Sequence, residues 1–167
     1  MKPKKRPNLK LPFSSIDKIL VLISILCVIL SWGLLIALWD KIPDMVPTHF
    51  NFAGQPDSYG RKGSLLIVII ISTIIAIPLL LLSKVPYIYN YPFNITTDNA
   101  ERQYKNSRRL ILVMSAQIQA FFLYINIKSI YIAMNKSESL GFFSIIIFMF
   151  ILFASLGYYT WKMYKLK

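Results

Sequence analysis

The apolar residues of this chain are gathered into four long blocks instead of alternating with polar residues. The blocks cover residues 16–39, 65–83, 110–134 and 140–161. A helix rises about 1.5 Å per residue and needs about 20 residues to cross a hydrocarbon layer about 30 Å thick, which is close to the length of each block. No amphipathic stretches are left over to cover four such helices in water. The pattern therefore predicts an all-α membrane protein built as a four-helix transmembrane bundle.

The limits of the blocks divide the chain into five parts. A basic N-terminal segment, 1–15, precedes a two-helix unit, 16–83, in which an outer loop over 40–64 joins two spans. A basic loop over 84–109 begins a helix, a second helix pair occupies 110–161, and a tail covers 162–167. We do not expect the first span to be a cleaved signal peptide, because its apolar run exceeds the roughly 7–15 residues of a signal core and no small-residue cleavage site follows it.

Basic residues give the expected orientation, because Lys and Arg near the ends of spans are retained in the cytoplasm. One side of the blocks carries Lys2, Lys4, Lys5, Arg6, Lys10, Lys84, Arg102, Lys105, Arg108, Arg109, Lys162, Lys165 and Lys167, and the other carries Lys41, Arg61, Lys62 and Lys136. Both termini are therefore predicted to be cytoplasmic.

Composition narrows the classes of function. The chain has 167 residues, 16% of them charged, with 19 Lys+Arg, 7 Asp+Glu, one His and one Cys, for a net charge of +12. No His, Cys or carboxylate pair falls inside the predicted bilayer, so we expect neither an enzyme nor a cofactor. The basic loops are expected to contact the lipid bilayer through anionic headgroups. No soluble basic and aromatic module remains that could bind nucleic acid.

The segment between the first two spans has the most distinctive chemistry. Prolines fix φ and bias the preceding residue toward extended geometry, and glycines allow a positive φ. We predict an ordered Pro/Gly-rich extracytoplasmic loop. Its candidate ligand-binding or structural residues are Pro43, Asp44, Pro47, His49, Phe50, Asn51, Gly54, Pro56, Asp57, Tyr59, Gly60 and Lys62.

Three roles are open for this loop. It could set the geometry of the two helices that it joins, or it could bind an extracellular peptide, toxin or small ligand, because defined loops on rigid scaffolds often carry function. His49, Asp44 and Asp57 also offer one nitrogen and two carboxylates to a divalent ion. They are weak candidates, since a lone loop His more often makes local hydrogen bonds, and no metal is assigned.

The residues from Pro43 to Lys62 follow the order Pro-Asp-x-Val-Pro-x-His-Phe-Asn-x-x-Gly-x-Pro-Asp-x-Tyr-Gly-x-Lys. This order resembles the signature of the bacterial membrane family called domain of unknown function 1648, over about residues 30–80. That family is distantly related to the SdpI-type immunity proteins, so the resemblance implies a bacterial cell-membrane protein of immunity or signalling type. The chain departs from those proteins in having two fewer spans and no Gly-x-Arg motif at Pro92-Phe93-Asn94.

A second segment is similar to one in small members of that family. Its candidate cytoplasmic residues are Asn90, Pro92, Thr96, Asn99, Glu101, Arg102 and Tyr104, and a cytoplasmic regulator is the partner expected there. Asp98 followed by Glu101 predicts a helix N-cap with an acidic residue at the third helical position. The helix is expected to continue directly into the third span.

The third span carries several polar side chains, and its candidate intramembrane residues are Gln117, Gln119, Asn126 and Lys128. At helical spacing they fall on two neighbouring stripes, one of Ser115, Gln119, Phe122, Asn126 and Ser129 and the other of Gln117, Phe121, Tyr124 and Lys128. Polar groups in a bilayer face the bundle interior or water. The stripes indicate either hydrogen bonds between helices or a polar groove open to a ligand.

Together these features predict a non-enzymatic multi-pass protein of immunity or signalling type, which recognises a toxin, peptide or small ligand through its outer loop. The alternative is an accessory subunit of a transporter or other membrane complex, suggested by the small size and the polar third span. A proton-coupled transporter is disfavoured, because no Asp or Glu lies in the interior of a span.

Overall fold

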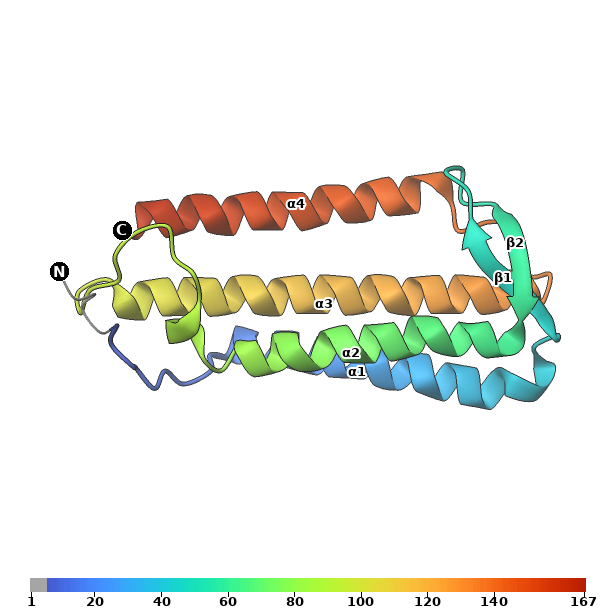
Figure 1. The fold of residues 1–167 in the computed structure, drawn as a ribbon, viewed down its shortest axis with the longest axis horizontal. Coiled ribbons are helices and arrows are strands. Elements are labelled where there is room, and N and C mark those ends of the chain that lie inside the picture. Colours follow the sequence, from blue (N-terminus) through green and yellow to red (C-terminus); the bar gives the residue numbers. More distant parts are fainter. Residues whose placement is uncertain (1–5) are drawn as a thin grey trace.

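The computed structural model describes residues 6–167. Its long helices are α1 (Ser15–Leu38), α2 (Leu65–Leu82), α3 (Ala100–Ala133) and α4 (Phe142–Lys165), as shown in Figure 1. Two strands, β1 (Met45–Phe50) and β2 (Pro56–Arg61), lie between α1 and α2, and short 3₁₀ turns cover Trp39–Lys41, Lys62–Ser64 and Pro86–Ile88. In the described part of the chain, four helices are long and apolar enough to cross a membrane. The four predicted long apolar helices are therefore confirmed.

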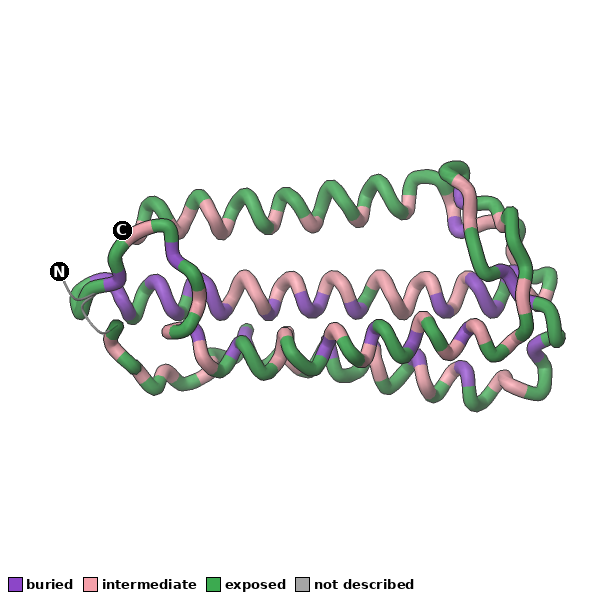
Figure 2. The backbone as a smooth tube through the Cα atoms, in the orientation of Figure 1, coloured by how far each residue is buried: buried purple, intermediate pink, exposed green. Residues whose placement is uncertain are grey.

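Helix α3 is the central element of the bundle. Helices α1 and α2 lie along one side of it and α4 lies along the other (Figure 1). Buried residues occur from one end of α3 to the other, whereas α4 has none (Figure 2). The core is thus made by α1, α2 and α3, and α4 is a peripheral helix attached to α3.

The bundle exposes apolar side chains and buries polar ones, the reverse of a soluble protein. Ile36 and Phe150 are 70% and 74% exposed. Buried side chains between the helices include Ser24, Ser72 and Gln119. This distribution is favourable when hydrocarbon is the solvent, because polar groups then gain by meeting one another between helices.

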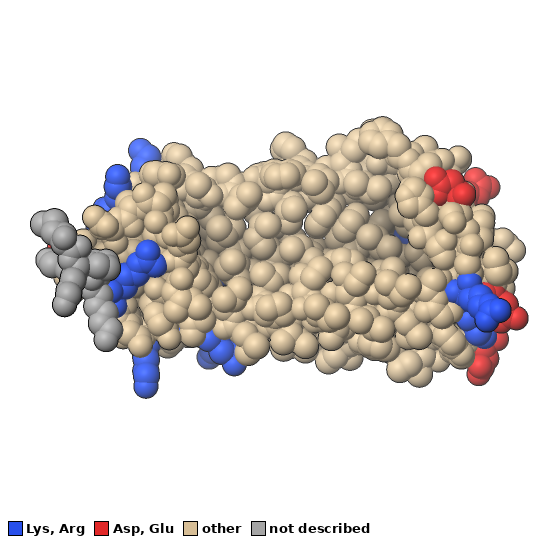
Figure 3. Space-filling model, viewed as in Figure 1, with Lys and Arg blue, Asp and Glu red and all other residues tan. Residues whose placement is uncertain are grey.

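Charged residues gather at the two ends, as the face in Figure 3 shows. We call the end that carries β1 and β2 the hairpin end, and the end that carries Arg6 and the last turn of α4 the terminal end (Figure 1). Residues 40–64 and the α3–α4 connection both lie at the hairpin end. Together they contain four acidic residues, Asp40, Asp44, Asp57 and Glu138. The belt between the ends matches the apolar layer of a bilayer.

Two helix starts show how capping works here. Ser14 and Asp17 form a capping box on α1, in which the Ser14 amide donates to Asp17 Oδ2 (2.9 Å) and the Asp17 amide donates to Ser14 Oγ (3.2 Å). The predicted N-cap of α3 at Asp98 is wrong by one residue, because Asn99 is the N-cap. Asn99 turns its amide backward, accepting from the Thr96 amide and donating to the Asn94 carbonyl. The predicted continuous helix from this loop into the third span is α3 itself.

Candidate functional site

The outer segment forms an antiparallel hairpin, so the predicted Pro/Gly-rich loop over 40–64 is replaced over twelve residues by two strands. Met45 pairs with Arg61 and Phe50 with Pro56, and the register shifts between Pro47 and Phe50. Prolines are tolerated here because each strand has a free edge and the irregular register removes ladder bonds. The conformational preferences of proline and glycine account for the turn, but they do not specify that the two strands pair.

The turn of the hairpin is built by Asn51 and Gly54. Asn51 Oδ1 accepts from the Gln55 amide at 3.0 Å, and the Gly54 amide donates to the Asn51 carbonyl at 2.8 Å. Gly54 has a φ of +78°, a conformation that side chains disfavour. Gly60 is required for another reason, since a Cβ there would lie 2.8 Å from Thr48 Cγ2.

The predicted metal-ligand candidates do not come together. His49 Nδ1 lies 2.5 Å from Asp57 Oδ1 on the open face of the hairpin, whereas Asp44 lies 3.7 Å from Lys62 Nζ. Within residues 6–167, no three His, Cys, Asp or Glu side chains are grouped as a metal site would need. Lys62 also lies over the Trp39 ring, 5.1 Å from its centroid. The two acidic residues thus serve separate local pairs.

The base of the hairpin is anchored in the bundle. Val46, fully buried, belongs to a cluster with Ile42, Leu35 and Ile130, which come from the start of the segment, α1 and α3. Pro47 is also buried, whereas Pro43 and Tyr59 are exposed. The hairpin is therefore held rigidly on the ends of α1, α2 and α3 and presents one face outward.

The tip of the hairpin reaches across to the peripheral helix. The Leu140 amide donates to the Gly54 carbonyl at 2.7 Å, and the Phe52 and Phe142 rings meet edge to face at 5.4 Å. Phe52 nevertheless remains 83% exposed. The tip thus covers the connection between α3 and α4 while offering a large aromatic surface.

Beneath this contact lies a cleft of about 290 Å³ between α3 and α4. Figure 3 shows a hollow on this side of the molecule. The lining is mainly apolar and consists of Gln117, Ala120, Phe121, Tyr124, Ser144, Ile147, Phe148 and Ile151. The Phe121 and Phe148 rings stack at 3.9 Å within it. Tyr124 donates to the Leu140 carbonyl and lies 2.7 Å from Ser144 Oγ. The cleft combines a hydrophobic wall with a few fixed polar groups, as small-ligand sites do.

The two polar stripes of the third span face different neighbours. Gln119 accepts from Ser72 of α2 at 2.5 Å, and Asn126 donates to the Ser31 carbonyl of α1 at 3.0 Å. Gln117 instead faces the cleft and donates to Ser155 of α4 at 2.7 Å, while its buried Oε1 has no partner among the described residues. Lys128 reaches Ser137 in the α3–α4 connection at 2.6 Å. The first stripe contacts α1 and α2, whereas Gln117, Phe121 and Tyr124 of the second line the cleft between α3 and α4.

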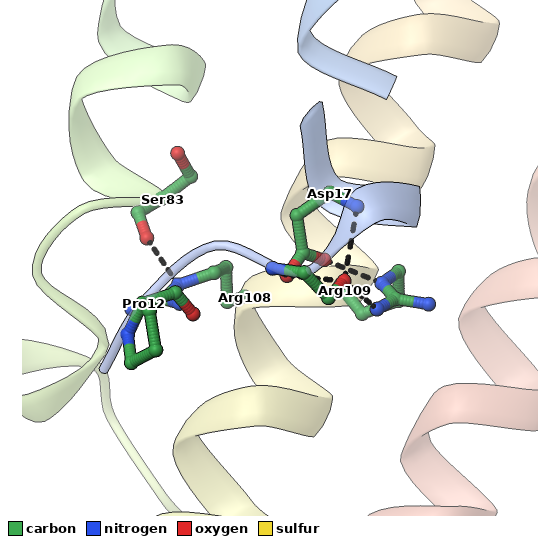
Figure 4. A network of polar contacts seen from close by, with 6 residues as sticks. Pro12, Asp17, Ser83, Arg108 and Arg109 are labelled. Carbon is green, nitrogen blue, oxygen red and sulfur yellow. Dashed lines mark hydrogen bonds and ion pairs between the residues drawn. The ribbon is translucent and has the colours of Figure 1, made fainter. Parts of the chain in front are cut away.

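The terminal end contains a polar network that the sequence did not indicate (Figure 4). Arg108, 2% exposed, donates to the carbonyls of Ser83 and Pro12, each at 3.0 Å. Arg109 donates to Asp17 Oδ1 at 2.5 Å and to Ser14 Oγ at 2.7 Å. These two arginines fasten the N-terminal segment and the end of α2 onto α3.

The predicted cytoplasmic residues divide into packed and exposed ones. Tyr104 is fully buried and donates to the Pro7 carbonyl at 2.9 Å. It packs with Tyr91, Ile95 and Ala100, so much of the basic loop is a folded cap on the bundle. The exposed residues are Asn90, Pro92, Thr96, Glu101 and Arg102. Glu101 pairs with Lys105, and Arg102 donates to the carbonyls of Leu166 and Lys167.

Burial of the phenol group raises the pKa of Tyr91 to about 12, and burial likewise raises the pKa of Tyr89. The Tyr91 hydroxyl donates to the Pro86 carbonyl at 2.9 Å, and Arg6 lies 5.5 Å from its ring centroid. A neutral phenol is thus part of the folded cap.

The fold and its apolar outer surface define a multi-pass membrane protein. Within it, residues 26–75 match a family described as a domain of unknown function, DUF1648. The chain is also similar to an uncharacterized protein from Archaeoglobus fulgidus, 26% identical over 151 residues, which covers 82% of each chain. No solved structure matches this chain. The matched family segment contains the hairpin, the C-terminal half of α1 (26–38) and the first part of α2 (65–75).

Proposed function

We propose that this protein is a non-enzymatic receptor in a bacterial cell membrane, of immunity or signalling type, which recognises a hydrophobic or amphipathic peptide at the hairpin end. The hairpin faces outward and both termini are cytoplasmic. The observation that carries the proposal is the cleft between α3 and α4 directly beneath the exposed hairpin tip. Such a site binds a ligand that has both apolar and polar groups, and a membrane-active peptide has both.

The hairpin and the cleft contact different parts of the ligand. Phe52 and the His49–Asp57 pair meet the polar and aromatic groups of the ligand above the membrane surface. Phe121, Phe148 and Tyr124 receive its apolar part between the helices. The distant relation of the DUF1648 family to SdpI-type immunity proteins favours a toxin as the peptide.

The proposed orientation rests on charge. The terminal end holds most of the basic residues of the loops, and the hairpin end holds Asp40, Asp44, Asp57 and Glu138. Anionic lipid and the positive-inside rule both favour the terminal end in the cytoplasm.

The peripheral position of α4 supports a signalling step. No residue of α4 is buried, and its contact with α3 runs from the cleft to the terminal end. A ligand between α3 and α4 shifts α4 only if it binds the shifted arrangement more tightly. The shift would change the exposed surface of the basic loop, where Phe93 contacts Tyr164 of α4 and a cytoplasmic regulator binds near Asn90 and Pro92.

The first experiment compares a deletion strain with an overexpressing strain during challenge with the secreted peptides of the producing organism. We expect deletion to raise sensitivity to one peptide and overexpression to lower it. Ala120→Trp fills the cleft and abolishes protection at unchanged membrane abundance. The matched control is Ala154→Trp, an exposed position on α4 outside the cleft. Unchanged sensitivity across the panel would contradict the immunity function.

A second experiment tests the hairpin. Asp57→Asn removes the charge beside His49, and we expect it to reduce protection without changing membrane abundance. Asp44→Asn is the control, because its carboxylate is exposed and makes only the long contact with Lys62. A collapse in abundance for Asp57→Asn would show that the hairpin is only a structural clasp.

An accessory subunit of a transporter or other membrane complex is the second candidate. It is favoured by the apolar surface of α4, which no other part of the described chain covers. A permease or ATPase encoded beside this protein, with transport activity lost on its deletion, would favour this function over the first.

A further inference from the structure

A second cleft lies at the opposite end of the α3–α4 seam. It has a volume of about 260 Å³ and is formed by the first turns of α3 and the last turns of α4. Its lining includes four cationic side chains, Arg102, Lys105, Arg109 and Lys162, together with Asn106 and Tyr159. It is separate from the outer cleft, with which it shares no residue.

The cations outnumber the carboxylates around this cleft. Lys105 pairs with Glu101 and Arg109 pairs with Asp17, both at 2.5 Å. Arg102 donates to the main-chain oxygens of Leu166 and Lys167, and neither it nor Lys162 pairs with an Asp or Glu side chain in residues 6–167. The four cationic side chains therefore outnumber the two side-chain carboxylates that pair with them. Such a cleft attracts an anion.

Asn106 adds a feature that points to the kind of anion. It is 4% exposed, and its Nδ2 donates to the Tyr159 carbonyl at 3.0 Å. That bond fixes which end of the amide is the oxygen. Asn106 Oδ1 has no partner among the described residues and can accept a hydrogen bond. A phosphodiester anion carries no O–H and offers no donor for it, whereas a headgroup hydroxyl does.

The position favours a lipid as the source of the phosphate. The cleft lies where the apolar surface of α4 ends, and the exposed aromatic residues Tyr158 and Trp161 flank it in sequence. Aromatic residues of this kind lie at headgroup depth in a bilayer. Acyl chains of a bound lipid would run along the exposed apolar face of α4 toward the middle of the membrane.

We propose that this cleft binds the phosphodiester of an anionic glycerophospholipid whose headgroup carries hydroxyl groups. Lys162 and Arg102 neutralise the phosphate, and Asn106 Oδ1 accepts from a headgroup hydroxyl. Basic pockets between transmembrane helices bind anionic headgroups by the same electrostatics. The proposal does not depend on the outer ligand, because no residue of the outer cleft takes part.

Native mass spectrometry of the purified full chain in detergent tests the proposal with three lipids. Phosphatidylglycerol carries the charge and the hydroxyls, phosphatidylethanol carries the same charge without hydroxyls, and phosphatidylcholine carries no net charge. We expect binding in that order, from strongest to weakest. Equal binding of phosphatidylglycerol and phosphatidylcholine would overturn the proposal. Displacement of bound phosphatidylglycerol by an equal concentration of inorganic phosphate would overturn the lipid source.

Two matched variants distinguish a defined lipid-binding site from nonspecific electrostatic attraction of anionic lipid to the protein. Lys162→Gln removes a cation that lines the cleft, and we expect phosphatidylglycerol binding to fall about fivefold. Lys165→Gln removes a cation one turn along the same helix that does not line the cleft, and it should leave binding within about twofold of the unaltered protein. Equal losses in the two variants would contradict a defined site. Circular dichroism of both variants confirms that the helices are retained.

Discussion

Arg109 of α3 donates a hydrogen bond from Nε to Oδ1 of Asp17 in α1, over 2.5 Å. The Asp17 side chain is 7% exposed and the Arg109 side chain 23% exposed. Asp17 also closes the capping box of its own helix with Ser14. One carboxylate therefore both starts α1 and ties it to the central helix at the terminal end.

Removing this carboxylate charge should destabilise the bundle. Asp17→Asn keeps an oxygen for the cap but leaves Arg109 without its counter-charge, at a cost of about 3 kcal/mol in the free energy of unfolding. The double variant Asp17→Asn with Arg109→Gln should recover part of that loss. Thermal unfolding in detergent measures both. The control is Glu101→Gln, which breaks an exposed pair and should cost about 0.5 kcal/mol or less. Equal shifts for Asp17→Asn and Glu101→Gln would refute the argument.

Gly54→Ala should loosen the hairpin tip from the α3–α4 connection. The substitution places a side chain at a φ of +78°, and its Cβ would lie 3.2 Å from the Gly141 amide nitrogen. We expect a loss of about 1 kcal/mol and faster hydrogen exchange of the Leu140 amide, which donates to the Gly54 carbonyl. Gly33→Ala is the control, since nothing lies within 4 Å of its added Cβ. Unchanged exchange at Leu140 in Gly54→Ala would show that the tip is not docked.

Alkaline pH should unfold the cap at the terminal end through Tyr91. The folded chain keeps this phenol neutral up to its pKa of about 12, whereas a phenol in the unfolded chain ionises near 10. The stabilisation is therefore fully present below about pH 10 and is lost as the pH rises through about 12. The thermal midpoint should fall over this range, and it should fall less in Tyr91→Phe. Identical pH profiles for the two proteins would exclude Tyr91 as the group responsible.

The proposed orientation is open to a cysteine-labelling test. The chain has one cysteine, Cys27, which is buried in α1, so single introduced cysteines can be labelled with little background. Ala53→Cys at the hairpin turn should react with an impermeant maleimide on intact cells. Thr97→Cys in the exposed basic loop should react only after the cells are permeabilised. The opposite pattern would reverse the proposed faces.

The ends of the first two spans were predictable almost to the residue. The predicted blocks 16–39 and 65–83 correspond to α1 (Ser15–Leu38) and α2 (Leu65–Leu82). Bilayer thickness sets the length of an apolar run, and polar flanks end it, so both limits are local properties of the sequence. The two stripes of the third span were also visible, because helical spacing alone separates Gln117 from Gln119.

The hairpin and the terminal network were not predictable in this way. Phe50 pairs with Pro56 through cross-strand geometry, which turn chemistry does not specify. Arg109 and Asp17 are 92 positions apart, and nothing near either residue indicates the other.

The sequence by itself determined that four helices are long and apolar enough to cross a membrane, where the first two begin and end almost to the residue, and at which end most of the basic residues of the loops gather. Only the tertiary structure decided which polar side chains meet: Ser72 with Gln119, Ser31 with Asn126, and Gln117 with the cleft. The reason is physical. Hydropathy and helix spacing act within one segment, whereas the partner of a buried polar group is set by how separate helices pack and rotate against one another.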